Sequence, residues 1–195
     1  MTPHFVTPED RLFGDATLPQ DSRVVDFWRW AFSDLSEDYL KGLFAEWMVA
    51  VLLGLPLQGS HRLEFARYDH VLAGKRIEVK STARWQSWKL LDEEGRRRAA
   101  PKKPATVDDK VRFEGLRTTS GTYNADLYVF CFQHETEPQQ WNALDLNQWE
   151  FYALPRAELE RLGTKSIALK TLRRLAPRLT AHDLQDKYGA ERHPA

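Results

Sequence analysis

Three charged residues, Asp69, Glu78 and Lys80, interrupt an otherwise largely apolar stretch of this chain. Residues two apart on a β-strand share one face, so Glu78 and Lys80 are expected side by side, roughly 7 Å apart along the strand. Ile77 and Val79 then point to the opposite face, toward a core. The pattern therefore predicts a strand with one charged face and one apolar face.

The length of the turn before this strand decides on which face Asp69 lies. A two-residue loop at 73–74 places Asp69 opposite Glu78, and a four-residue loop at 73–76 places it opposite Lys80. A three-residue loop separates the charges unless a bulge restores the parity. Two carboxylates held side by side repel, so such a pair indicates a cation or a lysine between them. A hard metal ion beside a lysine is suited to hydrolyse a phosphodiester.

A further acid, Glu46, lies in a segment with helical periodicity that runs from an N-cap at Ser36 to a stop at Gly54 and Pro56. Its helical neighbours three and four residues away are small or apolar: Gly42, Leu43, Val49 and Ala50. A lone carboxylate there is costly unless it is paired or binds a ligand. Two interpretations stay open: Glu46 completes a metal-binding cluster, or it forms a partly buried ion pair.

Asp69, eight intervening residues and then Glu78-Val79-Lys80 resemble the motif of the PD-(D/E)XK nuclease superfamily, which has the restriction-endonuclease-like fold. Asp69 matches the first acid of the motif, Glu78 the second, and Lys80 the lysine; Glu46 matches the carboxylate on an upstream helix. Tyr68 stands where the family usually has a proline. The resemblance covers about residues 36 to 90.

This resemblance implies an α/β fold, with a central mixed β-sheet flanked by α-helices, and a metal-dependent nuclease that uses Mg²⁺ or Mn²⁺. Asp69 and Glu78 would bind the ion, with the Val79 carbonyl as a third oxygen and Glu46 on the ion, its water or a second ion. Lys80 would orient the attacking water and offset the charge that develops on the phosphate.

Gln86, between Trp85 and Trp88, is a candidate donor to a phosphate or to a metal-bound water. The alternative is a surface amide among core aromatic residues. No glycine-rich phosphate loop, Ser-His-Asp order or zinc-like cysteine pair is present, so no organic cofactor is predicted.

Basic residues that follow the hairpin predict sequence-independent contacts with nucleic-acid phosphates. The basic candidates are a run without acids and two residues before it: Arg96, Arg97, Arg98, Lys102, Lys103, Arg84 and Lys89. Ser81 and Thr82, near the end of the hairpin, are further candidates for contacts with the phosphates. A solvated loop without function is the alternative for the run, and ordinary strand positions are the alternative for Ser81 and Thr82.

The chain has 195 residues with 42% apolar content and seven tryptophans, which predicts a folded globule. Its formal net charge is zero, so nucleic-acid binding requires a local basic patch. Cys131 is the single cysteine, which excludes an internal disulfide and favours a reducing compartment and a buried position. The beginning of the chain lacks the pattern of a signal peptide, and we expect a cytoplasmic protein without a membrane span.

The expected organisation is an N-terminal arm (1–20), one domain (21–190) with a basic insertion at 84–124, and a tail (191–195). Helices are expected at 24–35, after Pro155 up to Gly163, and at 167–175 and 180–188, and strands at 62–72, 75–83, 127–132 and 148–154.

We expect an endonuclease that cuts DNA in preference to RNA, in restriction, phage defence or repair. Target choice would come from the insertion, a partner protein or a second subunit. Two alternatives stay open: a catalytically inactive nuclease-fold module that binds DNA or regulates, and a structural protein whose charges form a buried salt-bridge network.

Overall fold

The computed structural model describes residues 5–13, 22–57, 62, 66–85, 110–137 and 139–190. The chain divides into two compact units, Met1–Leu35 and Ser36–Ala195, which we describe separately. The predicted end of the arm at residue 20, residues 86–109 of the predicted insertion and the predicted tail at 191–195 lie outside the described residues.

The first unit contains helix α1 (Val24–Phe32), which confirms the helix expected at 24–35. The backbone N–H of Arg23 donates to the Asp26 carboxylate at 3.2 Å and so satisfies a donor at the helix start. Aromatic rings cluster along the helix, with Phe27 5.8 Å from Phe32 between ring centroids.

The second unit is built on a mixed four-stranded sheet with the order β1-β2-β4-β5. The strands are β1 (His70–Leu72), β2 (Lys75–Ala83), β4 (Leu127–Gln133) and β5 (Trp149–Pro155). β2 runs antiparallel to β1 and parallel to β4, and β4 runs antiparallel to β5. Strand β4 is buried from Tyr128 to Gln133, as its unbroken apolar sequence predicts for a central strand.

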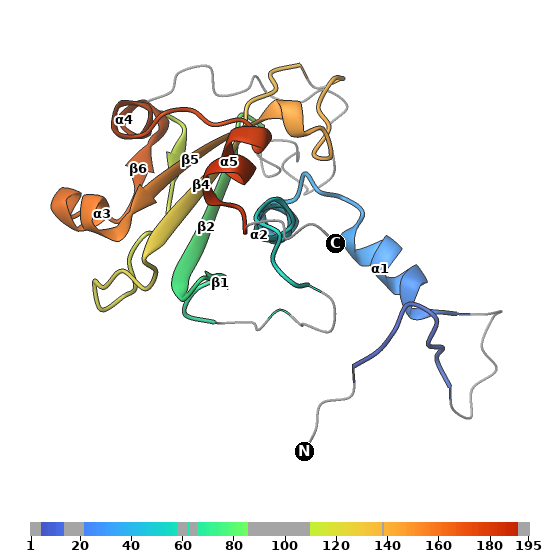
Figure 1. Ribbon diagram of the computed structural model, residues 1–195. Helices are drawn as coiled ribbons and strands as arrows, with labels where there is room; N and C mark the ends of the chain where they lie inside the picture. The colour runs from blue at the N-terminus through green and yellow to red at the C-terminus, as the bar shows by residue number, and fades with distance from the viewer. Residues whose placement is uncertain are drawn as a thin grey trace. The chain divides into compact units, whose positions relative to one another are not determined.

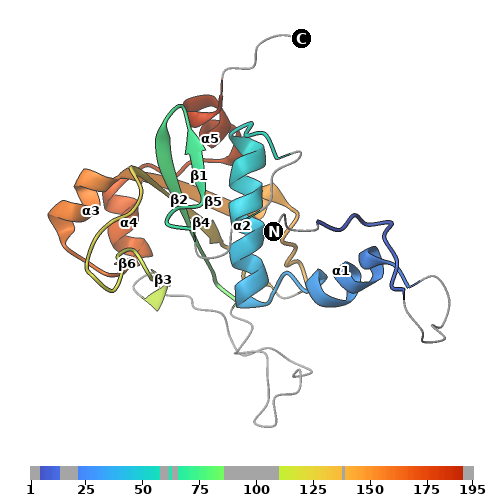
Figure 2. The ribbon, with the colours of Figure 1, turned by 90° about the horizontal axis from the view of Figure 1, so that it is seen from below.

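Helices cover both faces of this sheet, so the mixed α/β architecture with flanking helices is confirmed (Figures 1 and 2). On one face lie α2 (Asp38–Leu52) and α5 (Ala181–Tyr188), which share a core with Ile77 and Val79. On the other lie α3 (Arg156–Leu162), α4 (Leu169–Leu175) and a small sheet of β3 (Arg112–Phe113) and β6 (Ile167–Ala168). A short 3₁₀ turn, η3 (Leu146–Gln148), precedes β5.

Strand alternation assigns each buried residue of β4 to one of two cores. Val129 and Cys131 belong to the core beneath α2, whereas Tyr128, Phe130 and Phe132 belong to the core beneath α3 and α4. Burial raises the pKa of the Cys131 thiol, which confirms its expected role as a small apolar core residue. No helix within the described ranges is long and apolar enough to cross a membrane.

Most element boundaries follow local sequence signals. The α3 helix ends at Gly163, where φ is +63°, and α5 begins with the predicted capping box of Thr180 and Asp183. The N-cap of α2 is Glu37 rather than Ser36, and its extended backbone conformation at ψ 134° starts the helix one residue later than expected. The helix expected from 167 begins only at Leu169, because Ile167–Ala168 pairs with β3.

A buried carboxylate on β5 joins the sheet to α4. Glu150, 6% exposed, accepts hydrogen bonds from the Tyr152 hydroxyl (2.6 Å) and from Arg173 (2.8 Å), and Arg178 lies 3.5 Å away. Burial alone would raise the pKa of Glu150, but the hydrogen bonds from Arg173 and Tyr152 hold it below its ordinary value.

We expect Glu150→Ala to lower the free energy of unfolding by about 3 kcal/mol, because it leaves a half-buried guanidinium and a buried phenol without their acceptor. The measurement is urea unfolding at pH 7. Glu158→Ala is the control, since its ion pair with Arg161 is exposed and should contribute less than about 1 kcal/mol. Equal effects of the two substitutions would contradict the assignment.

Candidate active site

A two-residue turn sets the register of the β1–β2 hairpin. Leu72 pairs with Lys75, and the intervening Ala73 and Gly74 have φ values of +48° and +78°. Positive φ at both central positions is typical of the type I′ hairpin turn. Of the two even-length loops considered, the structure has the shorter one.

Asp69 lies one residue before β1, next to the last pair of the hairpin, which is His70 with Ile77. Its backbone N–H donates to the Ile77 carbonyl at 3.0 Å. Its carboxylate Oδ2 accepts the Val79 backbone N–H at 2.7 Å, so a side chain takes the place of a strand partner. The described ladder of β1 therefore begins at His70, and the strand expected from residue 62 is shorter than predicted.

The Val79 carbonyl points to this same edge of β2, because the N–H and C=O groups of one strand residue face the same neighbouring strand. Beyond His70, the edge of β2 carries the Asp69 side chain instead of a paired strand. The Asp69 carboxylate and the Val79 carbonyl thus lie at the same edge of β2, as expected for two ligands of one metal ion.

Glu78 and Lys80 share one face of β2, as their spacing predicts. The Lys80 Nζ lies 2.7 Å from Glu78 Oε1, and the two side chains are 23% and 17% exposed. Their partners in the parallel register are Tyr128 and Phe130, which are buried in the core beneath α3 and α4. The charged pair therefore lies at the border of an apolar layer, where charges interact more strongly than in water.

Glu46 extends from α2, and both of its carboxylate oxygens accept hydrogen bonds from Arg62, at 2.6 and 3.0 Å. The Glu46 side chain is 17% exposed. This geometry favours the ion-pair interpretation for the structure as it stands. The backbone carbonyl of Glu46 lies 2.9 Å from His70 Nε2, which connects α2 directly to β1.

The environment of Asp69 raises its pKa to about 7. Burial is the largest cause and the charge of Glu78 the second; the Val79 N–H opposes them, Glu46 adds to the rise and Lys80 offsets part of it. Among the described residues Asp69 forms no ion pair. The charges of Glu78, Glu46 and Lys80 thus all act on the Asp69 carboxylate, which is half-buried and has no cation paired with it among the described residues.

The donor set has the chemistry of a hard-cation site, since Asp69, Glu78 and the Val79 carbonyl all offer oxygens. Within the described part of the chain, no three acid, histidine or cysteine side chains converge closely enough to hold a metal ion as they stand. The ion pairs give the reason: Glu78 is turned to Lys80 and Glu46 to Arg62. Asp69 and the Val79 carbonyl therefore offer oxygens as they stand, whereas Glu78 would have to turn from Lys80 and Glu46 would have to be released by Arg62.

The remaining predicted contacts are placed only in part. Ser81 is half-buried and Thr82 is 7% exposed, which favours an ordinary strand role for Thr82. The Arg84 guanidinium lies over the Phe132 ring, 5.1 Å from its centroid. Gln86, Lys89, Arg96, Arg97, Arg98, Lys102 and Lys103 lie outside the described residues.

Arg62 is the neighbour that sequence reasoning missed. It lies 16 residues after Glu46, outside any periodic pattern that could pair the two. The sequence shows only that Glu46, an acid on an apolar helix face, needs a positively charged partner, and several arginines could equally be that partner.

The chain matches no family model, no curated protein and no solved structure. Its function therefore has to be inferred from the residues of the site themselves.

We expect Asp69→Asn to raise the free energy of unfolding at pH 8 without divalent ions. The folded-state pKa of about 7 exceeds the ordinary value of 3.8, so the folded state binds the proton more tightly and loses stability as the pH rises between these values. The loss is about 4 kcal/mol at most. Asparagine removes the charge and keeps an acceptor for the Val79 N–H.

Urea unfolding in EDTA at pH 4, 6 and 8 measures this effect, and the difference between variant and wild type should shrink toward pH 4. The matched control is Asp126→Asn, because hydrogen bonds from Arg76 lower the pKa of Asp126, and its loss should reduce stability at pH 8. A destabilised Asp69→Asn protein at pH 8 would instead support a purely structural role for the cluster.

Proposed function

We propose that this protein is a metal-dependent nuclease of the PD-(D/E)XK superfamily, with the restriction-endonuclease-like fold, and that it hydrolyses phosphodiester bonds in DNA. The observation that carries the proposal is the placement of Asp69 at the edge of β2 beyond His70, bonded to the Val79 N–H and close enough to Glu78 for that charge to raise its pKa. The Lys80 ammonium lies 2.7 Å from Glu78 and completes the set that such chemistry needs.

The order of elements supports the assignment. Helix α2 precedes the β1–β2 hairpin, and the strand pairings continue through β4 to β5 in a mixed sheet with helices on both faces. The His70 contact with the Glu46 carbonyl holds the hairpin against α2, so the helical acid lies in electrostatic range of Asp69. This is the spatial relation that the superfamily motif implies.

Asp69, Glu78 and the Val79 carbonyl would hold the ion. Mg²⁺ or Mn²⁺ bound there supplies charge neutralisation at the phosphate and lowers the pKa of a bound water. The Lys80 ammonium would donate to the attacking water or to the phosphate, and its positive charge would offset the negative charge that develops there. Partial burial strengthens both effects, because fewer waters screen the charges.

A second candidate is a DNA-binding or regulatory module that keeps the nuclease fold without cleaving. The ion pairs favour it, since Lys80 neutralises Glu78 and Arg62 neutralises Glu46. Asp69 favours the nuclease, because a half-buried acid beside another acid is costly and gains from a cation.

We expect cleavage of supercoiled plasmid in Mg²⁺ or Mn²⁺ that EDTA abolishes and that Lys80→Ala lowers by about 100-fold or more, because the variant loses a donor to the developing charge. Nicked and linear products, measured on agarose gels, report endonuclease activity. The control is Lys187→Ala, an exposed lysine on α5 at the opposite face of the sheet. Cleavage that persists in EDTA, or that Lys80→Ala leaves unchanged, would contradict the proposal. DNA binding without cleavage would support the second candidate.

We expect Mn²⁺ to raise the melting temperature at pH 7.5, since an ion that binds only the folded state stabilises it by about 2.7 kcal/mol at 100 times its Kd. Glu78→Gln should shift the Mn²⁺ titration to higher concentration by about tenfold or more. Differential scanning fluorimetry gives both curves. Glu158→Gln is the matched control on the exposed face of α3. A titration curve that is the same for wild type and Glu78→Gln would exclude Glu78 as a ligand.

A further inference from the structure

A loop after β3 runs along the same sheet face as Glu78 and Lys80. At one end, a β-carbon placed on Gly115 (φ +67°) would lie 3.8 Å from the Lys80 Nζ. At the other end, the Tyr123 ring packs edge-on against Tyr128, 6.1 Å between centroids. Tyr128 is the register partner of Glu78 on the neighbouring strand. The loop therefore extends from the Lys80 side chain of the candidate active site to the Tyr123 ring that packs on Tyr128.

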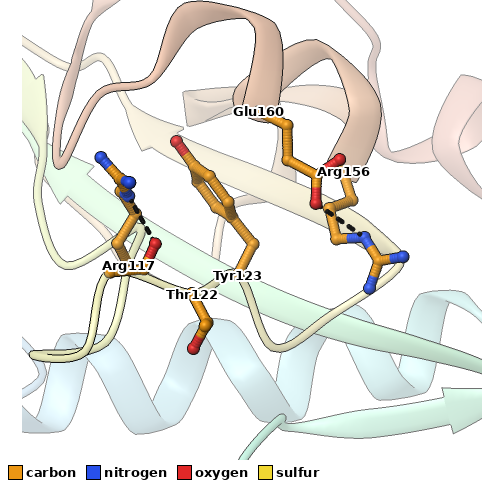
Figure 3. Close-up of a pocket in the computed structure, with 6 residues that line it drawn as sticks. Arg117, Thr122, Tyr123, Arg156 and Glu160 are labelled. Atoms are coloured by element: carbon orange, nitrogen blue, oxygen red, sulfur yellow. Dashed lines mark hydrogen bonds and ion pairs between the residues drawn. The ribbon is translucent and has the colours of Figure 1, made fainter.

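An open pocket lies at the Tyr123 end of this loop. Figure 3 shows the Tyr123 ring between Arg117 on one side and Arg156 with Glu160 on the other. Two positive charges and one negative charge line it, which gives a net positive pocket. Such a pocket suits an anionic group.

Arg117 is fixed in place without a carboxylate. Its Nε donates to the Gly121 carbonyl at 2.9 Å, its Nη1 donates to the Gly163 carbonyl at 2.8 Å, and its guanidinium lies over the Tyr123 ring. These bonds use two of the five N–H donors of a guanidinium. Arg117 is half-buried and makes no ion pair with any described residue. A partly desolvated, unneutralised and preoriented cation is favourable when an anion binds beside it.

Arg156 is held more loosely. Its Nε lies 3.3 Å from Glu160 and its Nη1 lies 3.7 Å from Asp126, and its side chain is 39% exposed. At these distances the Arg156 side chain can turn toward a ligand, although Glu160 and Asp126 partly neutralise its positive charge. A fixed arginine and an adjustable one thus lie on opposite sides of Tyr123 (Figure 3).

Hydrogen bonds hold the turn that carries Thr122. Thr118 N–H donates to the Thr122 carbonyl and Gly121 N–H donates to the Thr118 carbonyl, both at 2.9 Å. The hydroxyls of Thr118 and Thr122 lie 2.8 Å apart, and Thr122 is exposed at the pocket. Phosphate groups on nucleic acids are bound by arginines together with threonine hydroxyls, which is the set assembled here.

We propose that this pocket is a phosphate-binding subsite that holds a backbone phosphate of the nucleic-acid substrate a few nucleotides from the bond to be cut. This inference rests on the proposed nuclease function. The spacing supports it, because Tyr123 is separated from Glu78 only by the Tyr128 side chain and one inter-strand distance of about 4.8 Å. A contact with a backbone phosphate carries no sequence information, so this subsite would act independently of sequence.

The test is fluorescence anisotropy with a labelled 12-nucleotide single-stranded DNA in EDTA, where cleavage does not interfere, at several salt concentrations. Thr122→Glu places a negative charge at the pocket, and Thr122→Gln measures the effect of shape alone. We expect Thr122→Glu to bind about tenfold more weakly than Thr122→Gln. Arg156→Gln should bind about fivefold more weakly than wild type, with a salt dependence reduced by about 0.7 in slope, the value for one lost contact to a single strand.

Arg161→Gln is the control, an exposed arginine on the same helix as Arg156, and it should bind within about twofold of wild type. An RNA strand of the same sequence should show the same ratios, since the backbone phosphate is shared. Equal binding by Thr122→Glu and Thr122→Gln overturns the subsite, as does a wild-type protein that binds neither strand at low salt. Intact binding with these ratios but no cleavage in Mg²⁺ or Mn²⁺ counts against the nuclease activity and leaves the subsite standing.

Discussion

The hydrogen bond from the Val79 backbone N–H to the Asp69 carboxylate connects the edge of β2 to an acid outside β1. An unsatisfied donor at a partly buried edge costs about 1–3 kcal/mol, so this bond favours the conformation that brings the carboxylate there. Repulsion from Glu78 and loss of solvent act in the opposite direction and raise the pKa of Asp69 to about 7. The geometry of the site thus depends on a backbone group that, among substitutions of Val79, only proline would remove.

The other charges near Asp69 are balanced within the protein. Lys80 lies 2.7 Å from Glu78, and Arg62 holds both oxygens of Glu46. Charges at this degree of burial are costly unless they are paired, so a folded chain without a bound cation requires such partners. Under the proposed function, Glu78 would exchange the lysine for the ion, and the Lys80 ammonium would then be available as a donor for substrate. Arg62 has the same relation to Glu46, which makes it a competitor for any ion that Glu46 would bind.

The sequence predicts the parts of the site that depend on local geometry. The even spacing of Glu78 and Lys80 is enough to predict the charged face, because strand alternation leaves little freedom, whereas the length of the turn stayed open until the register showed two residues. The buried strand around Val129 is equally predictable from its apolar run. Arg62 and Arg117 could not be predicted, because their partners are set by long-range packing: a helix acid 16 residues away, and the carbonyls of Gly121 and Gly163. The single-domain boundary at residue 21 stays a prediction.

The two faces of the sheet have separate roles, and β4 fixes the relation between them. Ile77 and Val79 anchor β2 beneath α2, and the same alternation puts Glu78 and Lys80 on the other face. On that face Tyr128 lies between Glu78 and Tyr123, and its strand is buried and paired on both sides. The distance from the acids to the Arg117 pocket is therefore set by inter-strand spacing and one packed ring pair. A substrate strand that contacts both places would meet a spacing that the packing of Tyr123 on Tyr128 ties to the core of the protein, although Arg117 and Thr122 themselves lie on a loop.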